Sequence, residues 1–130
     1  GLGDIVGAAE TRIGLARLNL VRKNFGDALT DCRTAARNLL DVGSMDFFVL
    51  ARITEARVHM AQGERDVASF MLDEIQLHAK QSVDRRVDFE MRLLAAHLEQ
   101  DPGALEQLAR DATSGGDLLY ANLARRSLEN

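Results

Sequence analysis

Two arginines, Arg17 and Arg57, stand forty residues apart, each at the end of a stretch that the sequence repeats as RIGLAR and RITEAR. A guanidinium group presents a planar fork of donors, which suits it to bind carboxylate or phosphate. Residues at the same place in successive repeats should lie in a row, so we expect this pair to hold an acidic group or a chain terminus. The alternative is that both are solvated or paired with Glu10 and Glu55 on the same helices.

The residues that most often hold metals or perform catalysis lack the partners that such chemistry needs. None of His59, His78 and His97 stands at ligand spacing with a Cys, an Asp or a second His, so no metal site is predicted. Cys32 falls on the apolar face of a predicted helix and lacks an activating base. Glu90, like the other carboxylates, is interpreted as an ordinary helix-surface residue. We therefore predict no catalytic residue, no cofactor and no enzymatic activity.

Size and composition favour a single all-helical domain over residues 1–130. The apolar share is 46%, but aromatic residues make up only 5% and Trp is absent, so Ala, Leu and Val must fill the interior. Such a composition favours helices over sheets. The net charge of -4 argues against nucleic-acid binding, which needs a clustered positive surface. No apolar run is long enough to span a membrane, and no signal peptide opens the chain.

The single Cys32 excludes an internal disulfide and is compatible with a reducing compartment, most simply the cytoplasm. The chain does not begin with Met, so we expect it to be a segment of a longer protein.

Hydrophobic periodicity predicts seven helices. They span residues 4–22, 25–40, 45–62, 64–81, 83–99, 103–112 and 117–128. Gly43 supplies a stop for the second helix, and Ser44 and Ser82 are candidate N-caps for the third and the fifth. The short linkers should force neighbouring helices to fold back antiparallel. The expected units are helical hairpins over 4–42, 44–81 and 83–113, with a helix over 117–129 that either caps the stack or begins a further hairpin.

Small residues recur where the two helices of a hairpin must approach closely. Ala16 would face Ala28 in the first hairpin, and Ala56 would face Ala68 in the second. Larger residues at matching places fill the flanks: Leu15, Phe25, Cys32 and Ala35, then Gly63, Leu72 and Ile75. With this pattern the chain resembles the tetratricopeptide repeat (TPR) family over about residues 9–79.

The period of forty residues is longer than is common in that family. Long variants resemble the repeats of large bacterial signalling proteins, including transcription regulators of the maltose-activator type. The third hairpin is degenerate, and Arg92, Ala95 and Ala96 all remain candidates for its small-residue position.

The resemblance implies a right-handed superhelix of antiparallel hairpins. It also implies a concave groove, lined by the first helix of each hairpin, in which partner peptides or helices bind. Transferred to this sequence, the groove residues are Glu10, Ile13, Arg17, Leu20, Val21, Leu50, Ile53, Arg57, Met60, Ala61, Phe89 and Leu93, with Arg86 and His97 as a continuation. The Lys and Asn residues of chaperone-binding members are missing, so a chaperone-tail receptor is not expected.

Three functions are compatible with this sequence. The leading hypothesis is a non-catalytic protein-interaction module that binds a peptide, a helix or another domain of its parent chain. The second is a regulatory arm that senses a small molecule within a larger bacterial signalling or transcription-regulator protein. The third is a structural scaffold or spacer that self-associates through Phe47, Phe48 and the last helix.

Overall fold

The computed structural model describes residues 1–129, which form seven helices and no strand. Their bounds are α1 Leu2–Val21, α2 Phe25–Asp41, α3 Met45–Ala61, α4 Arg65–Ala79, α5 Arg85–Glu99, α6 Pro102–Ser114 and α7 Leu118–Glu129. The prediction of an all-α fold with seven helices is confirmed. Within residues 1–129, no helix combines the length and the apolar character needed to cross a bilayer.

The fifth helix begins two residues later than predicted. Its N-cap is Asp84, whose carboxylate accepts a hydrogen bond from the backbone N–H of Arg86 at 2.8 Å. Ser82, the predicted cap, instead accepts a hydrogen bond from the backbone N–H of Asp84 at 3.2 Å and donates its hydroxyl to Asp46 of α3. The cap prediction was wrong because Ser82 ties the α4–α5 loop to α3, which leaves Asp84 to begin the helix.

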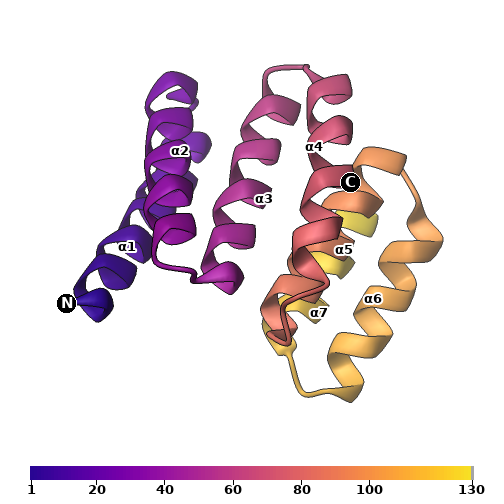
Figure 1. Cartoon of the computed structure of the whole chain (residues 1–130). Coiled ribbons are helices and arrows are strands. Elements are labelled where there is room, and N and C mark those ends of the chain that lie inside the picture. Colours follow the sequence, from indigo (N-terminus) through magenta and orange to yellow (C-terminus); the bar gives the residue numbers. More distant parts are fainter. Residues whose placement is uncertain (130) are drawn as a thin grey trace.

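Consecutive helices run antiparallel and stand side by side from α1 to α7 (Figure 1). Each odd-numbered helix also contacts the next odd-numbered one, whereas the described parts of α2, α4 and α6 contact only the odd-numbered helices beside them. The odd-numbered helices therefore form one continuous layer, and the even-numbered helices form a second layer with gaps. At the far end α6 packs more extensively against α7 than against α5, the partner predicted for it. The superhelical twist stays a prediction.

The alanines at the repeated small-residue positions are buried. Ala16, Ala28, Ala56 and Ala68 have no exposed surface, as their small size and repeated positions predicted. Ala96 lies forty residues after Ala56 and is also buried. Among the candidates for the small-residue position of the third repeat, Ala96 is thus the one that matches in both register and burial.

The buried side chains form two clusters that meet at α5. Val87 and Leu94 belong to a cluster shared with α1, α2, α3 and α4, whereas Phe89 and Leu93 belong to a cluster shared with α6 and α7. A helix that packs on two sides has little surface left for water. The polar residue Glu90 is therefore buried, whereas Arg85, Arg86 and Asp88 of the same helix stay exposed.

The turns after α1 and α3 have the same shape but different residues. Lys23 has a φ of 63° and Gly63, forty residues later, has a φ of 81°, so both adopt the left-handed conformation that ends a helix. Gly adopts this conformation at little cost, whereas a residue with a side chain is strained there.

Lys23→Gly is expected to stabilise the protein by about 0.5–1 kcal/mol, because relief of the strain outweighs the extra freedom of the unfolded chain. Gly63→Ala is the converse variant and should cost about 1 kcal/mol, since open space around Gly63 leaves backbone conformation as the only obstacle. Urea denaturation measures both changes. A Lys23→Gly variant less stable than the wild type would contradict this expectation.

Candidate binding site

The two repeated arginines meet at one buried carboxylate, that of Glu90 on α5. Arg17 Nη2 lies 3.5 Å from Glu90 Oε1, and Arg57 Nη2 lies 3.6 Å from Oε2. The hydroxyl of Tyr120 on α7 donates a hydrogen bond to Oε1 at 3.2 Å. Glu90 is only 8% exposed. This one side chain therefore joins all four odd-numbered helices, α1, α3, α5 and α7.

Two expectations about these charges were wrong. Glu90 was interpreted as a surface residue, but α5 packs on two sides and encloses it. Arg17 and Arg57 pair with Glu90 rather than with Glu10 and Glu55. The forty-residue period could have placed Glu90 on the groove side of its helix. Glu90 lies two periods, or eighty residues, after Glu10, which was predicted to line the groove.

Glu55 belongs to a separate ionic cluster between α2, α3 and α4. It is buried, and it accepts hydrogen bonds from Arg33 Nε at 3.2 Å and from Arg52 Nη1 at 2.8 Å. Arg52 also donates to Glu74 of α4 at 3.2 Å. The carboxylate of Glu55 thus has its hydrogen-bond donors without Arg57. Arg57 instead forms an ion pair with Glu90 of α5.

Burial and nearby charges shift the pKa values of two groups in the Glu90 cluster, Tyr120 and Arg57. Burial, reinforced by the charge of Glu90, raises the pKa of Tyr120 to about 12, so its hydroxyl keeps the proton that it donates. Burial lowers the pKa of Arg57, although Glu90 opposes this effect. Nη2 of Arg57 is buried without a hydrogen bond. The guanidinium therefore has donor capacity that the protein itself does not use.

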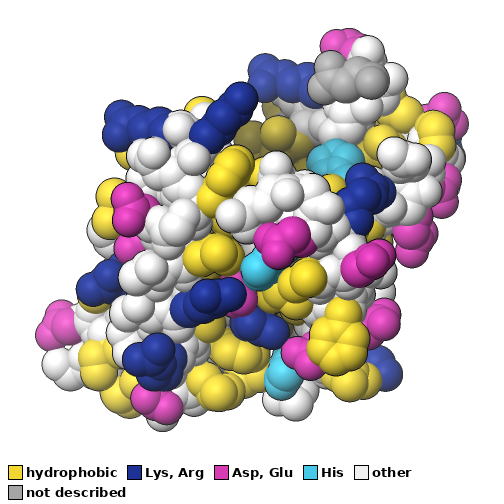
Figure 2. Space-filling model, turned by 90° about the horizontal axis from the view of Figure 1, so that it is seen from above, with side chains coloured by type: hydrophobic (Ala, Val, Ile, Leu, Met, Phe, Trp, Pro, Cys, Tyr) yellow, Lys and Arg dark blue, Asp and Glu magenta, His cyan; other side chains and the backbone are white. Residues whose placement is uncertain are grey.

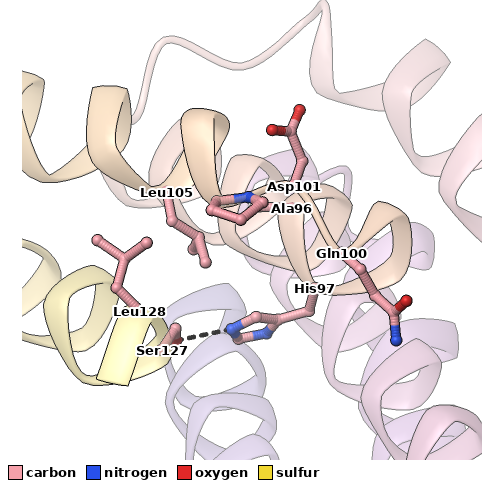
Figure 3. Close-up of a pocket in the computed structure, with 8 residues that line it drawn as sticks. Ala96, His97, Gln100, Asp101, Leu105, Ser127 and Leu128 are labelled. Carbon is pink, nitrogen blue, oxygen red and sulfur yellow. Dashed lines mark hydrogen bonds between the residues drawn. The ribbon is translucent and has the colours of Figure 1, made fainter. Parts of the chain in front are cut away.

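His97 of α5 gives this cluster a second connection to α7, in addition to Tyr120. Its Nδ1 lies 3.4 Å from Arg57 Nη1, and its Nε2 lies 2.8 Å from the hydroxyl oxygen of Ser127 (Figure 3). Burial and the charge of Arg57 lower the pKa of His97. His97 follows Arg57 by forty residues, as Arg57 follows Arg17, so it occupies the third place in the row of repeated positions.

Three hollows follow one another along the odd-numbered helices. The first, of about 150 Å³, is lined by Glu10, Ile13, Gly14, Arg17, Phe47, Leu50 and Arg86. The second, of about 270 Å³, is lined by Arg17, Arg57, Glu90, Leu93, His97, Leu123 and Ser127. The third, of about 430 Å³, is lined by Leu20, Arg57, Met60 and Ala61. Seen from above, the molecule has a hollow with hydrophobic side chains in its depth (Figure 2). We call the three hollows together the odd-helix groove.

Most residues predicted for the groove line one of these hollows, but three do not. Ile53 has no exposed surface, Phe89 packs against Tyr120, and neither lines any of the three hollows. Val21 is well exposed but lines none of the three hollows.

A further pocket, of about 360 Å³, adjoins the groove between α5, α6 and α7 (Figure 3). Its lining consists of Ala96, His97, Gln100, Asp101, Pro102, Leu105, Ser127 and Leu128. It shares His97 and Ser127 with the second hollow, so their hydrogen bond stands between the two spaces. Leu105 and Leu128 point into it in Figure 3.

Cys32 lies away from these spaces, within the helix packing. It has no exposed surface, and burial together with the nearby charges of Glu55 and Asp31 raises the pKa of its thiol to about 12. The thiol therefore stays protonated near neutral pH, in line with the prediction that it acts as a small apolar residue. Among residues 1–129, no group of three or more His, Cys, Asp or Glu side chains is placed to hold a metal ion.

No protein-family model, curated protein or solved structure matches this chain. The resemblance to TPR proteins therefore stays a prediction from the sequence, and a proposal about function rests on the geometry of the groove.

Glu90→Ala is expected to destabilise the fold by about 2–3 kcal/mol, because it removes the counter-charge of two arginines and leaves Arg57 without its ion-pair partner. The matched control is Asp88→Ala on the same helix. Asp88 has a side chain that is 58% exposed and one ion pair, with Arg92, so its loss should cost less than about 0.5 kcal/mol. Urea denaturation compares the two, and equal losses would contradict the central role of Glu90.

Proposed function

We propose that this chain is a non-catalytic protein-interaction module whose odd-helix groove binds an acidic peptide or helix. The observation that supports this most directly is the sharing of Arg17 and Arg57 between successive hollows. A bound segment that runs along the groove would pass both guanidinium groups. Two cations with a single carboxylate between them favour a ligand that brings a second negative charge.

The charge of the groove differs in sign from that of the whole chain. Its lining includes the cations Arg17, Arg57 and Arg86 and the anions Glu10 and Glu90, which gives three minus two, or +1 with neutral histidine. The whole chain has a net charge of -4. This contrast steers an acidic segment toward the groove and away from the remaining surface.

Arg17 and Arg57 are better placed than Arg86 to supply this attraction. The Arg86 guanidinium already pairs with Asp84 at 3.0 Å and lies 5.4 Å from the centre of the Phe47 ring. Arg17 is 49% exposed at its side chain and has Glu90 as its ion-pair partner. A ligand carboxylate can therefore reach Arg17 without displacing a bidentate contact.

Apolar residues along the groove would supply most of the binding free energy. Leu20, Met60 and Leu93 line the hollows next to the arginines, and Leu20 and Met60 are partly exposed. Burial of such side chains contributes about 25 cal/mol for each Å² removed from water. The charges then select the sequence and orientation of the bound segment.

A regulatory arm that senses a small molecule is the second candidate. The observation in its favour is the pocket between α5, α6 and α7, whose volume of about 360 Å³ lies within the range of small-ligand sites. A peptide-binding module is supported better because the hollows follow one another along several helices. Self-association through Phe48 has less support because this side chain is buried in the core. A TPR-like superhelix and a cytoplasmic location remain part of the proposal.

The test is a selection of random peptides against the wild-type chain, followed by affinity measurement of the enriched sequences by calorimetry. We expect acidic peptides to be enriched. Arg17→Ala should weaken their binding by about tenfold, which corresponds to about 1.4 kcal/mol, because the charge-assisted contact is lost.

Arg12→Ala is the matched control. Arg12 is on the same helix, is 46% exposed and has a single ion pair, with Asp31 of α2, but it lines none of the three hollows. Its replacement should change affinity by less than about twofold. Equal effects of the two substitutions, or enrichment of neutral peptides, would overturn the assignment of the groove.

A further inference from the structure

We propose that an anionic group binds in the second hollow together with one proton, which His97 takes up. This inference rests on the proposed function, since it names how the groove recognises a carboxylate. It identifies His97 as the residue that makes acidic ligands bind more tightly as the pH falls.

The directions of the hydrogen bonds determine the protonation state of His97 in the free protein. The Ser127 hydroxyl has one proton, and it donates this proton to the backbone carbonyl of Leu123 at 3.0 Å. Its contact with His97 Nε2 at 2.8 Å therefore requires Nε2 to be the donor. The other nitrogen, Nδ1, then accepts from Arg57 Nη1 at 3.4 Å. Both contacts are satisfied by neutral imidazole with its proton on Nε2.

Protonation of Nδ1 would replace this acceptor by a donor that faces the Arg57 guanidinium. The two donors cannot share a hydrogen bond, and the two positive charges repel. An anion in the second hollow removes this conflict, because it can accept from both groups at once. The hollow of about 270 Å³ is lined by Arg17, Arg57 and His97, which provides space for a carboxylate near these three side chains.

Several charged groups lie around His97 on neighbouring helices, and among them Arg57 opposes its protonation. Arg57 of α3 is in direct contact, and Arg65 of α4 donates to the backbone carbonyls of His97 and Leu98. Arg17 of α1 lines the same hollow. The neighbouring groups that act in the other direction are Glu90 of α5, which pairs with both Arg17 and Arg57, and Asp101 at the start of α6, which caps that helix. Tyr120 of α7 stays neutral.

The sign of the pH dependence is set by these contacts. In the free protein burial and Arg57 keep the pKa of His97 below its ordinary value, so the side chain is neutral at pH 7. A bound carboxylate raises this pKa, so binding takes up a proton in the interval between the two values. Affinity must therefore rise as the pH falls through that interval, by about tenfold for each unit by which the ligand raises the pKa.

The experiment monitors the imidazole proton signals of His97 by NMR during pH titrations with the blocked amino acid Ac-Glu-NH2, and with its neutral counterpart Ac-Gln-NH2. We expect Ac-Glu-NH2 to raise the pKa of His97 by about one unit and to bind about tenfold more tightly at pH 5.5 than at pH 7.5. Ac-Gln-NH2 should leave the pKa unchanged. A pKa that does not respond to Ac-Glu-NH2 would overturn the inference.

Two variants distinguish proton uptake by His97 from proton uptake by other titratable side chains. His97→Gln should remove the pH dependence of Ac-Glu-NH2 binding, because the amide can donate to Ser127 but does not titrate. His78→Gln, on α4 and outside the odd-helix groove, should leave the pH dependence intact. Retention of the pH dependence in His97→Gln also overturns the inference.

The selected peptides distinguish this failure from failure of the proposed function. If acidic peptides bind in the groove with no change in the pKa of His97, the proton coupling is wrong and the interaction module stands. If Ac-Glu-NH2 raises the pKa but no selected peptide depends on Arg17, the anion site stands and the peptide-binding groove is wrong.

Discussion

The buried carboxylate of Glu90 is the interaction on which the inner face of this protein depends. Arg17 and Arg57 come from repeated positions on α1 and α3, and both guanidinium groups lie near the same carboxylate of α5, which also accepts the Tyr120 hydroxyl of α7. A charge enclosed among helices is tolerated only when it is paired and hydrogen-bonded. The cluster therefore favours the one arrangement in which all four odd-numbered helices meet, and it does so beside the surface that is open to a ligand.

The same cluster holds helices together and also lines the groove in which we propose that ligands bind. The Glu55 cluster links α2, α3 and α4, whereas the Glu90 cluster follows the odd-numbered layer, in which each helix contacts the next odd-numbered one. There Arg57 contacts both Glu90 and His97, and His97 contacts Ser127, which extends the network from α1 to α7. A helical stack with few aromatic residues in this way joins charged and titratable side chains of distant repeats in one network.

Much of the architecture could be predicted because it depends on short-range patterns. Apolar periodicity located all seven helices, and the repeated alanines of the first two hairpins are buried as predicted. For the third repeat the sequence left three candidates, and burial selects Ala96, which follows Ala56 by forty residues. Ile53 and Phe89 were predicted to line the groove because periodicity gives the direction in which a side chain points. It does not give how deeply the neighbouring helices bury that side chain.

The sequence by itself determined the helices, their antiparallel order and the repetition of Arg17 at Arg57, because these features depend on residue type and local spacing. Only the tertiary structure decided which carboxylate meets those arginines. Glu10 and Glu55 are closer in the sequence, but Glu55 is held by Arg33 and Arg52, and α5 brings Glu90 to the inner face. Ion pairing depends on distance in space and on burial. Both are set by the packing of distant helices, which local patterns do not specify.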